Sequence, residues 1–212
     1  LSPFWQPDLL IFRSSDNVLN GNTPNATVAL GFATNRSPIQ QVSAYVNFDE
    51  LIATSDSDGY IRSDCASSAF QGDRVVVMDR FKVNSFDSTG FNGEGQDDGT
   101  GAAQSPQANY LALKFTDPAI NIKCVNLAVA ATTGVQSFSV GIQPQVVLGM
   151  STLMTSVDSI IDGATASCAG YFAFSTSTAR AYSICNQEGI ATSKVAKTRQ
   201  GDYALLTLAD TA

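Results

Sequence analysis

Two clusters of acidic residues are the positions at which this sequence could hold a metal ion. Asp56 and Asp58 form the first cluster, and Glu94, Asp97 and Asp98 form the second, within a glycine-rich stretch. Carboxylate oxygens are ligands that Ca²⁺ prefers, but neither cluster is closed by the glutamate that ends an EF-hand loop. We therefore interpret both clusters as solvated acidic segments, and we predict no metal site and no cofactor.

Catalytic chemistry is restricted because the sequence contains no histidine. Ser-His-Asp and Cys-His nucleophiles and imidazole acid–base catalysis are therefore excluded. The segment Gly93-Glu94-Gly95 does not open a helix after a strand, as a phosphate-binding loop would. A carboxylate pair for glycoside hydrolysis stays an alternative, since spacing in sequence does not place two carboxyl groups across a sugar. We predict no catalytic residue and no enzymatic activity.

The cysteines are four in number, and none belongs to a C-x-x-C pair: Cys65, Cys124, Cys168 and Cys185. Without histidine to complete a ligand set, a structural zinc site is not expected. We interpret the cysteines as small core or half-buried residues. The alternative for one pair is a disulfide between Cys168 and Cys185 across neighbouring strands.

Composition and charge restrict the class of partner. Hydrophobic residues make up 44% of the chain and charged residues 15%, which indicates a packed core with a neutral polar surface. The net charge of −7 argues against nucleic acid, whose phosphates require clustered Lys and Arg. The only local cationic group, Lys194, Lys197 and Arg199, is interpreted as a solvated strand end. No apolar run approaches the ~20 residues of a membrane span.

The elements that must position these residues are short strands, rich in β-branched and aromatic side chains. The expected strands are 9–12, 27–33, 41–47, 74–78, 81–86, 110–114, 122–130, 135–142, 146–150, 169–175, 181–185 and 204–208. Turns are expected at Asn20-Gly21, Asp58-Gly59, Thr89-Gly90 and Asp162-Gly163, a mobile loop over 92–101, and a helical turn over 156–162. Many short strands at regular spacing predict an all-β sandwich or barrel.

The chain also contains an internal repeat. Residues 6–11 resemble 143–148, Ser43-Ala44-Tyr45 corresponds to Arg180-Ala181-Tyr182, 52–55 recur as 190–193, and Gln71-Gly72-Asp73 returns as Gln200-Gly201-Asp202. Four matches in the same order predict tandem β-sandwich or jelly-roll-like units from two diverged repeats. Residues 1–118 form the first unit, without lead-in strands, and residues 119–212 the second, without C-terminal strands. The chain opens without Met, so we expect a processed chain or a segment of a longer polypeptide.

The repeat leads to expectations about packing. Period-2 alternation predicts the inward side chains Leu9, Ile11, Val28, Val75, Val77, Leu111 and Leu113 in the first copy, and Val146, Leu148, Phe172 and Leu205 in the second. Pro7 and Pro144 lack an N–H, so each should stand at the start of a strand. Two incomplete copies risk open sheet edges, which predicts a homo-oligomer with β-pairing between chains. The alternative is that both halves share one sandwich.

Three motifs carry a resemblance to a known family. They are Trp5-Gln6-Pro7, with Gln143-Pro144 in the second copy, Ser85-Phe86-Asp87-Ser88-Thr89-Gly90-Phe91, and Tyr110-Leu111-Ala112-Leu113. In this order they resemble a repeat of tailed-phage and prophage virion structural proteins, whose members read Gly-Phe-Gln-Pro at the first motif. Trp5 stands where Phe is usual, and the second copy lacks the two later motifs. The resemblance implies a head decoration, fibre or tail component, and it carries over no catalytic residue.

We therefore expect a phage virion structural protein, located in the virion or outside the cell. Its expected partners are other copies of itself and other virion proteins, with no nucleic acid and no membrane. Attachment to a host-surface glycan is a further expectation. The alternative is a carbohydrate-binding adhesin module without catalysis, in which exposed aromatic residues such as Trp5 stack on sugar rings. A glycan hydrolase is the third hypothesis.

Overall fold

The structure is a computed structural model, which describes residues 5–15, 26–49, 56–70, 77–97, 107–117, 119–128, 137–152, 157–158, 166–175, 178–187 and 195–201. Every regular element within these ranges is a β-strand, so the prediction of an all-β fold is confirmed. In the same ranges, no helix has the length and apolar character needed to cross a bilayer.

The described strands form three antiparallel sheets, which we name A, B and C. Sheet A has the order β4-β3-β2-β1-β8, from β1 (Leu9–Ser15), β2 (Ala26–Thr34), β3 (Gln40–Asp49), β4 (Asp56–Arg62) and β8 (Gln107–Leu113). Sheet B has the order β5-β6-β7, from β5 (Ser67–Phe70), β6 (Val77–Asp87) and β7 (Gly90–Asp97). Sheet C has the order β12-β11-β10-β9, from β9 (Val146–Thr152), β10 (Ala166–Ser175), β11 (Ala179–Gln187) and β12 (Val195–Gln200).

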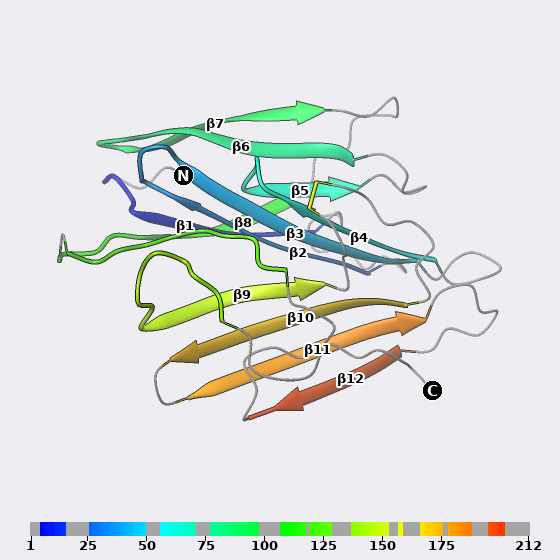
Figure 1. The fold of residues 1–212 in the computed structure, drawn as a ribbon. Helices are drawn as coiled ribbons and strands as arrows, with labels where there is room; N and C mark the ends of the chain where they lie inside the picture. The colour runs from blue at the N-terminus through cyan, green and yellow to red at the C-terminus, as the bar shows by residue number, and fades with distance from the viewer. Residues whose placement is uncertain are drawn as a thin grey trace.

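The three sheets lie as layers, with sheet B at the top, sheet A in the middle and sheet C at the bottom of Figure 1. Side chains alternate between the two faces of a strand, so a strand of the middle layer serves two interfaces. Along β1, Leu10 and Phe12 are buried against sheet B, whereas Ile11 points the other way and lines a cleft toward sheet C.

The interface between sheets A and B contains the apolar core. Its buried members are Leu10, Phe12, Ala33, Ala66 and Val83. The backbones approach most closely where β2 passes under the start of β5, because a Cβ added at Gly31 would lie 1.8 Å from the carbonyl oxygen of Ala66. Only glycine, which has no Cβ, allows this approach.

Polar side chains join the same two sheets at β3. The Gln41 side chain is buried and acts like an extra peptide group, since its Oε1 accepts from Val83 N at 2.9 Å and its Nε2 donates to Val83 O at 3.4 Å. The Oγ atoms of Ser43 and Ser68 lie 3.2 Å apart. Buried polar groups need such partners, so these bonds fix the position of sheet B over β3.

The two Gln-Pro strands occupy equivalent places. β1 and β9 each begin an antiparallel meander, β1-β2-β3-β4 in sheet A and β9-β10-β11-β12 in sheet C. Pro7 and Pro144 each precede their strand, as predicted. The strands of sheets A and B all come from residues 1–118 and those of sheet C from 119–212, although the division into two tandem sandwich or jelly-roll units stays a prediction.

The hydrogen-bond register refines the repeat. The residue numbers of each pair sum to 105 between β3 and β4 and to 381 between β11 and β12, so the offsets of the two strands sum to 276 (381 − 105), or 138 each if both strands share one offset. This is the offset of the sequence match between 52–55 and 190–193 (190 − 52). The match of Ser43-Ala44-Tyr45 to Arg180-Ala181-Tyr182 is one residue out of register (180 − 43 = 137). An offset of 138 fits better, because a shift of one residue moves every side chain to the opposite face, and Val46 and Ile184 (46 + 138) lie in one cluster.

Sheets A and C pack through equivalent faces. Val46 of β3 is buried in a cluster with Val28, Met150 and Ile184, and Ile184 is the repeat equivalent of Val46 (46 + 138). Ile11 and its equivalent Leu148 (11 + 137) line one cleft between the sheets. The two meanders therefore face each other, and the alternative of one sandwich shared by both halves stays a prediction.

Several predicted elements are wrong. The strands expected over 122–130 and 135–142 are irregular throughout 122–128 and 137–142, and their remaining residues lie outside the described ranges. The loop expected over 92–101 is strand β7 as far as Asp97, and Asp58-Gly59 lies inside β4 rather than in a turn. β5 and β12 were not expected at all. The strand expected over 204–208 and most of the helical turn over 156–162 lie outside the described residues.

The predicted inward side chains were assigned to the less buried face. Five of these side chains are half-buried, namely Leu9, Ile11, Val28, Leu113 and Phe172. Leu111, Val146 and Leu148 are 54%, 65% and 48% exposed. Alternation was correct, but the prediction assumed a single buried face. In the middle layer the A–B face is the tightly packed one, and the A–C face is only partly closed. The side chains of Val75, Val77 and Leu205 lie outside those that the structure describes.

Candidate functional site

The three motifs of the resemblance meet in space, and we call their meeting point the motif cluster (residues 5–8, 85–91 and 110–113). Gln6 Nε2 donates to the carbonyl oxygen of Phe86 at 3.1 Å, which joins the first motif to the second. The backbone N–H of Asp8 donates to Leu113 O at 2.8 Å, which joins the first to the third. Phe91 meets Tyr110 edge-to-face, with ring centroids 5.3 Å apart, which joins the second to the third.

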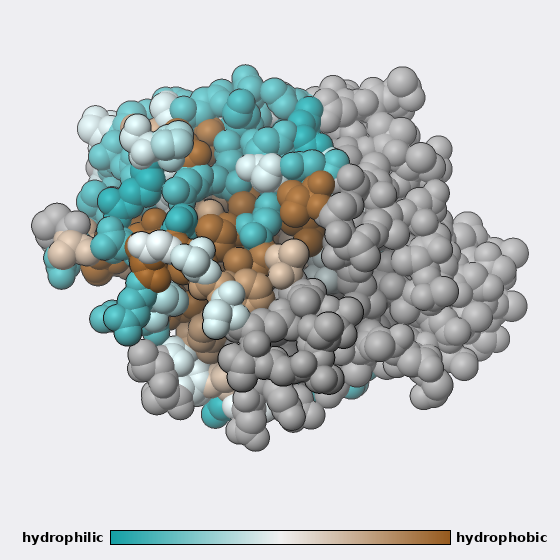
Figure 2. Space-filling view, viewed as in Figure 1, coloured by the Kyte–Doolittle hydropathy of each residue, from teal (hydrophilic) through white to brown (hydrophobic). Residues whose placement is uncertain are grey.

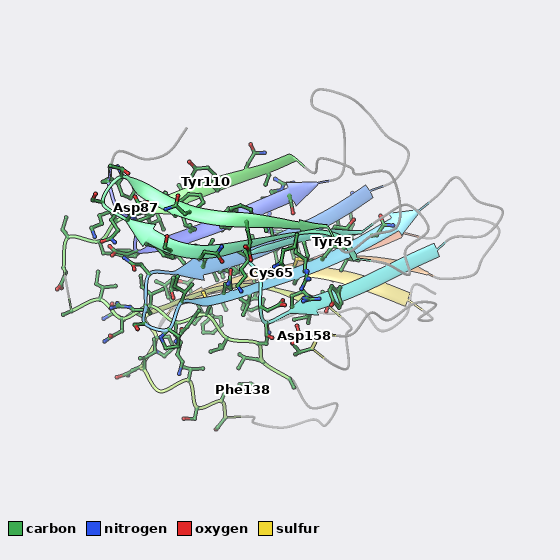
Figure 3. The ribbon with its side chains drawn as sticks, turned by 90° about the horizontal axis from the view of Figure 1, so that it is seen from above. Tyr45, Cys65, Asp87, Tyr110, Phe138 and Asp158 are labelled. Atoms are coloured by element: carbon green, nitrogen blue, oxygen red, sulfur yellow. The ribbon has the colours of Figure 1, made fainter. Side chains whose placement is uncertain are left out.

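The second motif is the hairpin between β6 and β7. Asp87 pairs with Gly90 across a two-residue loop, and Asp87 Oδ1 accepts from the backbone N–H of Thr89 at 2.9 Å. The Oδ2 atom accepts from Asn92 Nδ2 at 2.8 Å. Hydrogen bonds from Thr89, backbone first and then hydroxyl, lower the pKa of the Asp87 carboxyl. Such an Asx turn explains why Asp stands at this position, so the residue has a structural role (Figure 3).

Asp8 ties the first motif to its surroundings. Its Oδ2 accepts from Phe115 N at 2.8 Å and its Oδ1 from Lys114 Nζ at 3.2 Å. Its backbone oxygen accepts from Asn35 N at 3.0 Å. Every polar bond of the motif cluster named here thus closes a turn or joins two strands, and none presents a nucleophile beside a base.

The second Gln-Pro motif lacks these contacts. Gln143 and Pro144 are exposed, whereas Gln6 is half-buried and Pro7 is fully buried. Within the described residues, no strand lies on the outer side of β9 as β8 lies beside β1.

A second polar cluster, which sequence analysis missed, joins the two halves of the chain at the end of β4. Arg62 Nε donates to Asp64 Oδ1 at 2.7 Å and lies 3.7 Å from Asp158 Oδ1, and Arg80 Nη1 lies 3.1 Å from Asp64 Oδ2. Asp158 also accepts from Ser63 N at 2.9 Å. The hydrogen bond from Arg62 holds the pKa of Asp64 below its usual value.

This ion-pair cluster is structural rather than catalytic, because each carboxylate is held by a cation or an N–H group. Asp158 donates its own backbone N–H to Ile61 O at 2.7 Å, which fixes residues 157–158 against β4. The sequence did not predict the contact between Arg62 and Asp158, because the two residues lie far apart in it and are of common types.

The acidic clusters of the sequence do not form a described metal site. Asp56 and Asp58 lie on β4, and Glu94 is an exposed residue of β7 whose Oε1 accepts from Gln96 Nε2 at 2.9 Å. Within the described ranges, no group of three His, Cys, Asp or Glu residues is placed to hold a metal ion. Asp98 and the side chains of Asp56, Asp58 and Asp97 lie outside those that the structure describes.

Cys65 and Cys124 have thiols with a raised pKa, and Cys168 and Cys185 stand opposite each other on neighbouring strands. Cys65 is buried in the A–B interface, where burial raises the pKa of its thiol to about 11. Burial raises the pKa of Cys124 to about 12. Cys168 and Cys185 stand directly opposite each other on β10 and β11, so they lie on neighbouring strands, as the disulfide alternative requires.

An apolar cleft of about 520 Å³ lies between sheets A and C. Ile11, Leu30 and Phe32 line it from sheet A, and Leu148, Tyr171 and Ala173 from sheet C. Arg180 and Arg199 contribute the charged groups of the lining, and Arg180 Nη1 is held by Ala179 O and Gly201 O, each at 2.7 Å. The described lining residues offer shape and apolar area, and none of them carries a carboxylate, a thiol or an amine.

The outer surface has exposed apolar side chains at the level of this cleft. Figure 2 shows apolar side chains gathered across the middle of one face, beneath the more hydrophilic region of sheet B. The exposed fractions are 65% for Val146 and 48% for Leu148 on β9, 54% for Leu111 on β8, and 43% for Phe138.

Similarity to other proteins gives no assignment for these surfaces. No protein-family model matches the chain, and comparisons with curated proteins and with solved structures gave no significant match.

Proposed function

We propose that this chain is a structural protein of a tailed-phage or prophage virion, such as a head decoration, fibre or tail component. In this proposal it works by assembling with other copies of itself and with other virion proteins. It is located in the virion or outside the cell, binds neither nucleic acid nor membrane, and is not an enzyme. A role in attachment to a host-surface glycan is compatible with the same assembly.

The motif cluster supports this proposal. The motifs that resemble virion proteins are joined by the bonds Gln6–Phe86 and Asp8–Leu113 and by the contact Phe91–Tyr110. Their residues shape strands and turns, which is what motifs shared by structural proteins should do. An enzyme family would be expected to share reactive groups instead.

The observation that carries the proposal is the unequal completion of the two meanders. In sheet A the outer edge of β1 is covered by β8, with Leu9 opposite Leu113 and Ile11 opposite Leu111. In sheet C no described strand covers the equivalent edge of β9. An uncovered strand edge offers backbone N–H and C=O groups to another chain, which proteins that assemble use for contact.

Particle-associated mass spectrometry tests the proposal. A bacterial culture carrying the gene is induced, particles are banded on a density gradient, and peptides of the chain are quantified against those of the major capsid protein. We expect the peptides to band with the particles at many copies per particle. Peptides that stay in the soluble fraction, while the capsid protein bands, would overturn the virion role.

A carbohydrate-binding adhesin module is the second candidate, and the observation that favours it is the 40% exposure of Trp5. An exposed indole can stack on a sugar ring. Binding on a glycan array that Trp5→Ala abolishes would support this candidate. Tyr110→Ala is the control for removal of an exposed aromatic ring, because Tyr110 is 38% exposed and its ring packs against Phe12 and Phe91.

A further inference from the structure

The edge of β9 is the place where the second meander is incomplete, and the first meander shows what belongs there. Leu9 and Ile11 of β1 are half-buried beside β8, whereas their equivalents Val146 and Leu148 are 65% and 48% exposed. The sheet order places β8 on the outer side of β1, and none of the described strands on the corresponding side of β9, whose other side pairs with β10.

Charge distinguishes β9 from most of the other sheet edges. Natural edge strands are commonly protected by charged residues, which are costly to bury against a neighbour. The edge strands β4, β7 and β12 carry such residues: Asp56, Asp58 and Arg62 on β4, Glu94 and Asp97 on β7, and Lys197 and Arg199 on β12. The sequence of β9, Val-Val-Leu-Gly-Met-Ser-Thr, carries none.

The same comparison identifies the occupant. A charged edge strand of another molecule would bury its charges against apolar Val146 and Leu148. β5 is uncharged but has only four residues. β8 is uncharged and has seven residues, as β9 has, but Lys114, which is tied to Asp8 at 3.2 Å, follows its last residue at once. β9 is flanked by the uncharged Gln145 and Leu153, so β9 of a second copy matches β9 in length and in lack of charge at both ends.

We infer that β9 pairs antiparallel with β9 of a second copy of this chain, about a two-fold axis at Leu148. This inference rests on the proposed function, which it deepens by naming the contact between copies. The register places Leu148 opposite Leu148, Val146 opposite Met150 and Val147 opposite Gly149. A two-fold contact is self-complementary, since the same patch serves both subunits, and the pair joins two four-stranded sheets into one.

Net charge sets the salt dependence of this contact. Each copy carries a net charge of −7, so two copies repel each other at long range. Salt screens the repulsion between the two copies. It does not weaken the contact itself, which is apolar and hydrogen-bonded. Association should therefore strengthen when NaCl is raised from about 0.05 M to about 0.5 M, a range over which the Debye length falls severalfold.

Sedimentation of the 212-residue chain and of charge variants tests the pairing. Leu148→Lys and Leu148→Glu each place two like charges opposite each other at the axis, and we expect each to weaken association at least tenfold. An equimolar mixture of the two variants places Lys opposite Glu and should restore association. Leu111→Lys is the matched control, because Leu111 is 54% exposed on the edge strand β8 and should leave association unchanged. Circular dichroism of each variant checks that it is folded.

Three results would overturn the inference. One is a native chain that stays monomeric at all concentrations. Another is a Leu148→Lys variant that associates like the native chain, or that is not rescued by Leu148→Glu. The third is loss of association in Leu111→Lys, which would assign the contact to β8. If the chain is monomeric but its peptides still band with particles, the β9 pair is rejected and the virion role stands. If the chain forms the β9 dimer but is absent from particles, the virion role is rejected and the β9 pair stands.

Discussion

Replacing Gly31 with alanine should destabilise the protein strongly, because it adds one methyl group at the closest approach of sheets A and B. The new Cβ would lie 1.8 Å from the Ala66 carbonyl oxygen and 2.8 Å from its carbonyl carbon. Side-chain Cβ atoms essentially never approach within 3.0 Å of another heavy atom, so the two backbones must separate by at least 1.2 Å (3.0 − 1.8).

The expected loss of stability follows from the contacts that this separation would disturb. Ala66 is fully buried, and its N–H donates to Phe81 O at 2.9 Å, so it cannot move without moving β6. Overpacking a core by a methyl group costs typically 1–3 kcal/mol, and a rigid backbone neighbour places the expected value at about 3 kcal/mol. With a urea m-value of about 2 kcal/mol/M, the midpoint should fall by roughly 1.5 M.

Urea unfolding monitored by fluorescence measures this change, and Gly95→Ala is the control. A Cβ at Gly95 would have no heavy atom within 4 Å, and Gly95 lies on an exposed stretch of β7. Alanine relieves the entropic disadvantage of glycine in a strand, so Gly95→Ala should be neutral or stabilising by up to about 1 kcal/mol. If Gly31→Ala unfolded at the native midpoint, sheet B would not lie on β2 as described.

Three further predictions concern buried and paired groups. Gln41→Leu leaves the backbone N–H and C=O of Val83 without the side-chain amide, and urea titration should show a loss of about 1–3 kcal/mol. The raised pKa of Cys65, about 11, should keep its thiol unlabelled by iodoacetamide at pH 8. Because the unfolded thiol ionises first, stability from Cys65 is full below about pH 8.5 and falls as pH rises toward 11, which a Cys65→Ala comparison by thermal melting checks. Oxidation with copper phenanthroline should join Cys168 to Cys185, since opposed antiparallel residues lie within the Cα range of disulfides, and peptide mapping identifies the pair.

Strands with a strong local pattern were predictable from the sequence. β1, β2, β3 and β8 are rich in apolar and β-branched or aromatic residues, and they appear where they were expected. β4 was missed because its sequence Asp-Ser-Asp-Gly has the composition of a turn, and β7 was missed because its glycines have the composition of a loop. In β7 the reason for a glycine is spatial, since a Cβ at Gly93 would lie 2.4 Å from the ring of Phe81.

The number of sheet layers could not be predicted from the alternation of residues along single strands. Alternation places Leu9 and Ile11 on one face of β1 and Leu10 and Phe12 on the other, and both sets are apolar. The sequence does not say which set meets the tighter interface. That depends on how sheets B and C pack on sheet A, which is a property of contacts distant in sequence.

The site was predictable in part. The motifs were found from the sequence, but their meeting through Gln6, Asp8 and Tyr110 was not. An open sheet edge was expected in each half from the missing strands, and within the described residues no strand lies on the outer side of β9. The ion pairs between Arg62, Asp64 and Asp158 had no sequence signal, because nothing in the pattern brings residues 62 and 158 together.

Hydrogen–deuterium exchange of β9, measured in dilute and in concentrated protein, tests the assembly account most directly. The peptide spanning Val146–Thr152 reports the proposed contact, and the peptide spanning Gln107–Leu113 on the edge strand β8 serves as the internal reference. Backbone hydrogen bonds between copies protect amides, so we predict that the β9 peptide exchanges at least tenfold more slowly in concentrated protein, while the β8 peptide is unchanged. Equal exchange of β9 at both concentrations, with association seen by sedimentation, would contradict pairing of copies through β9.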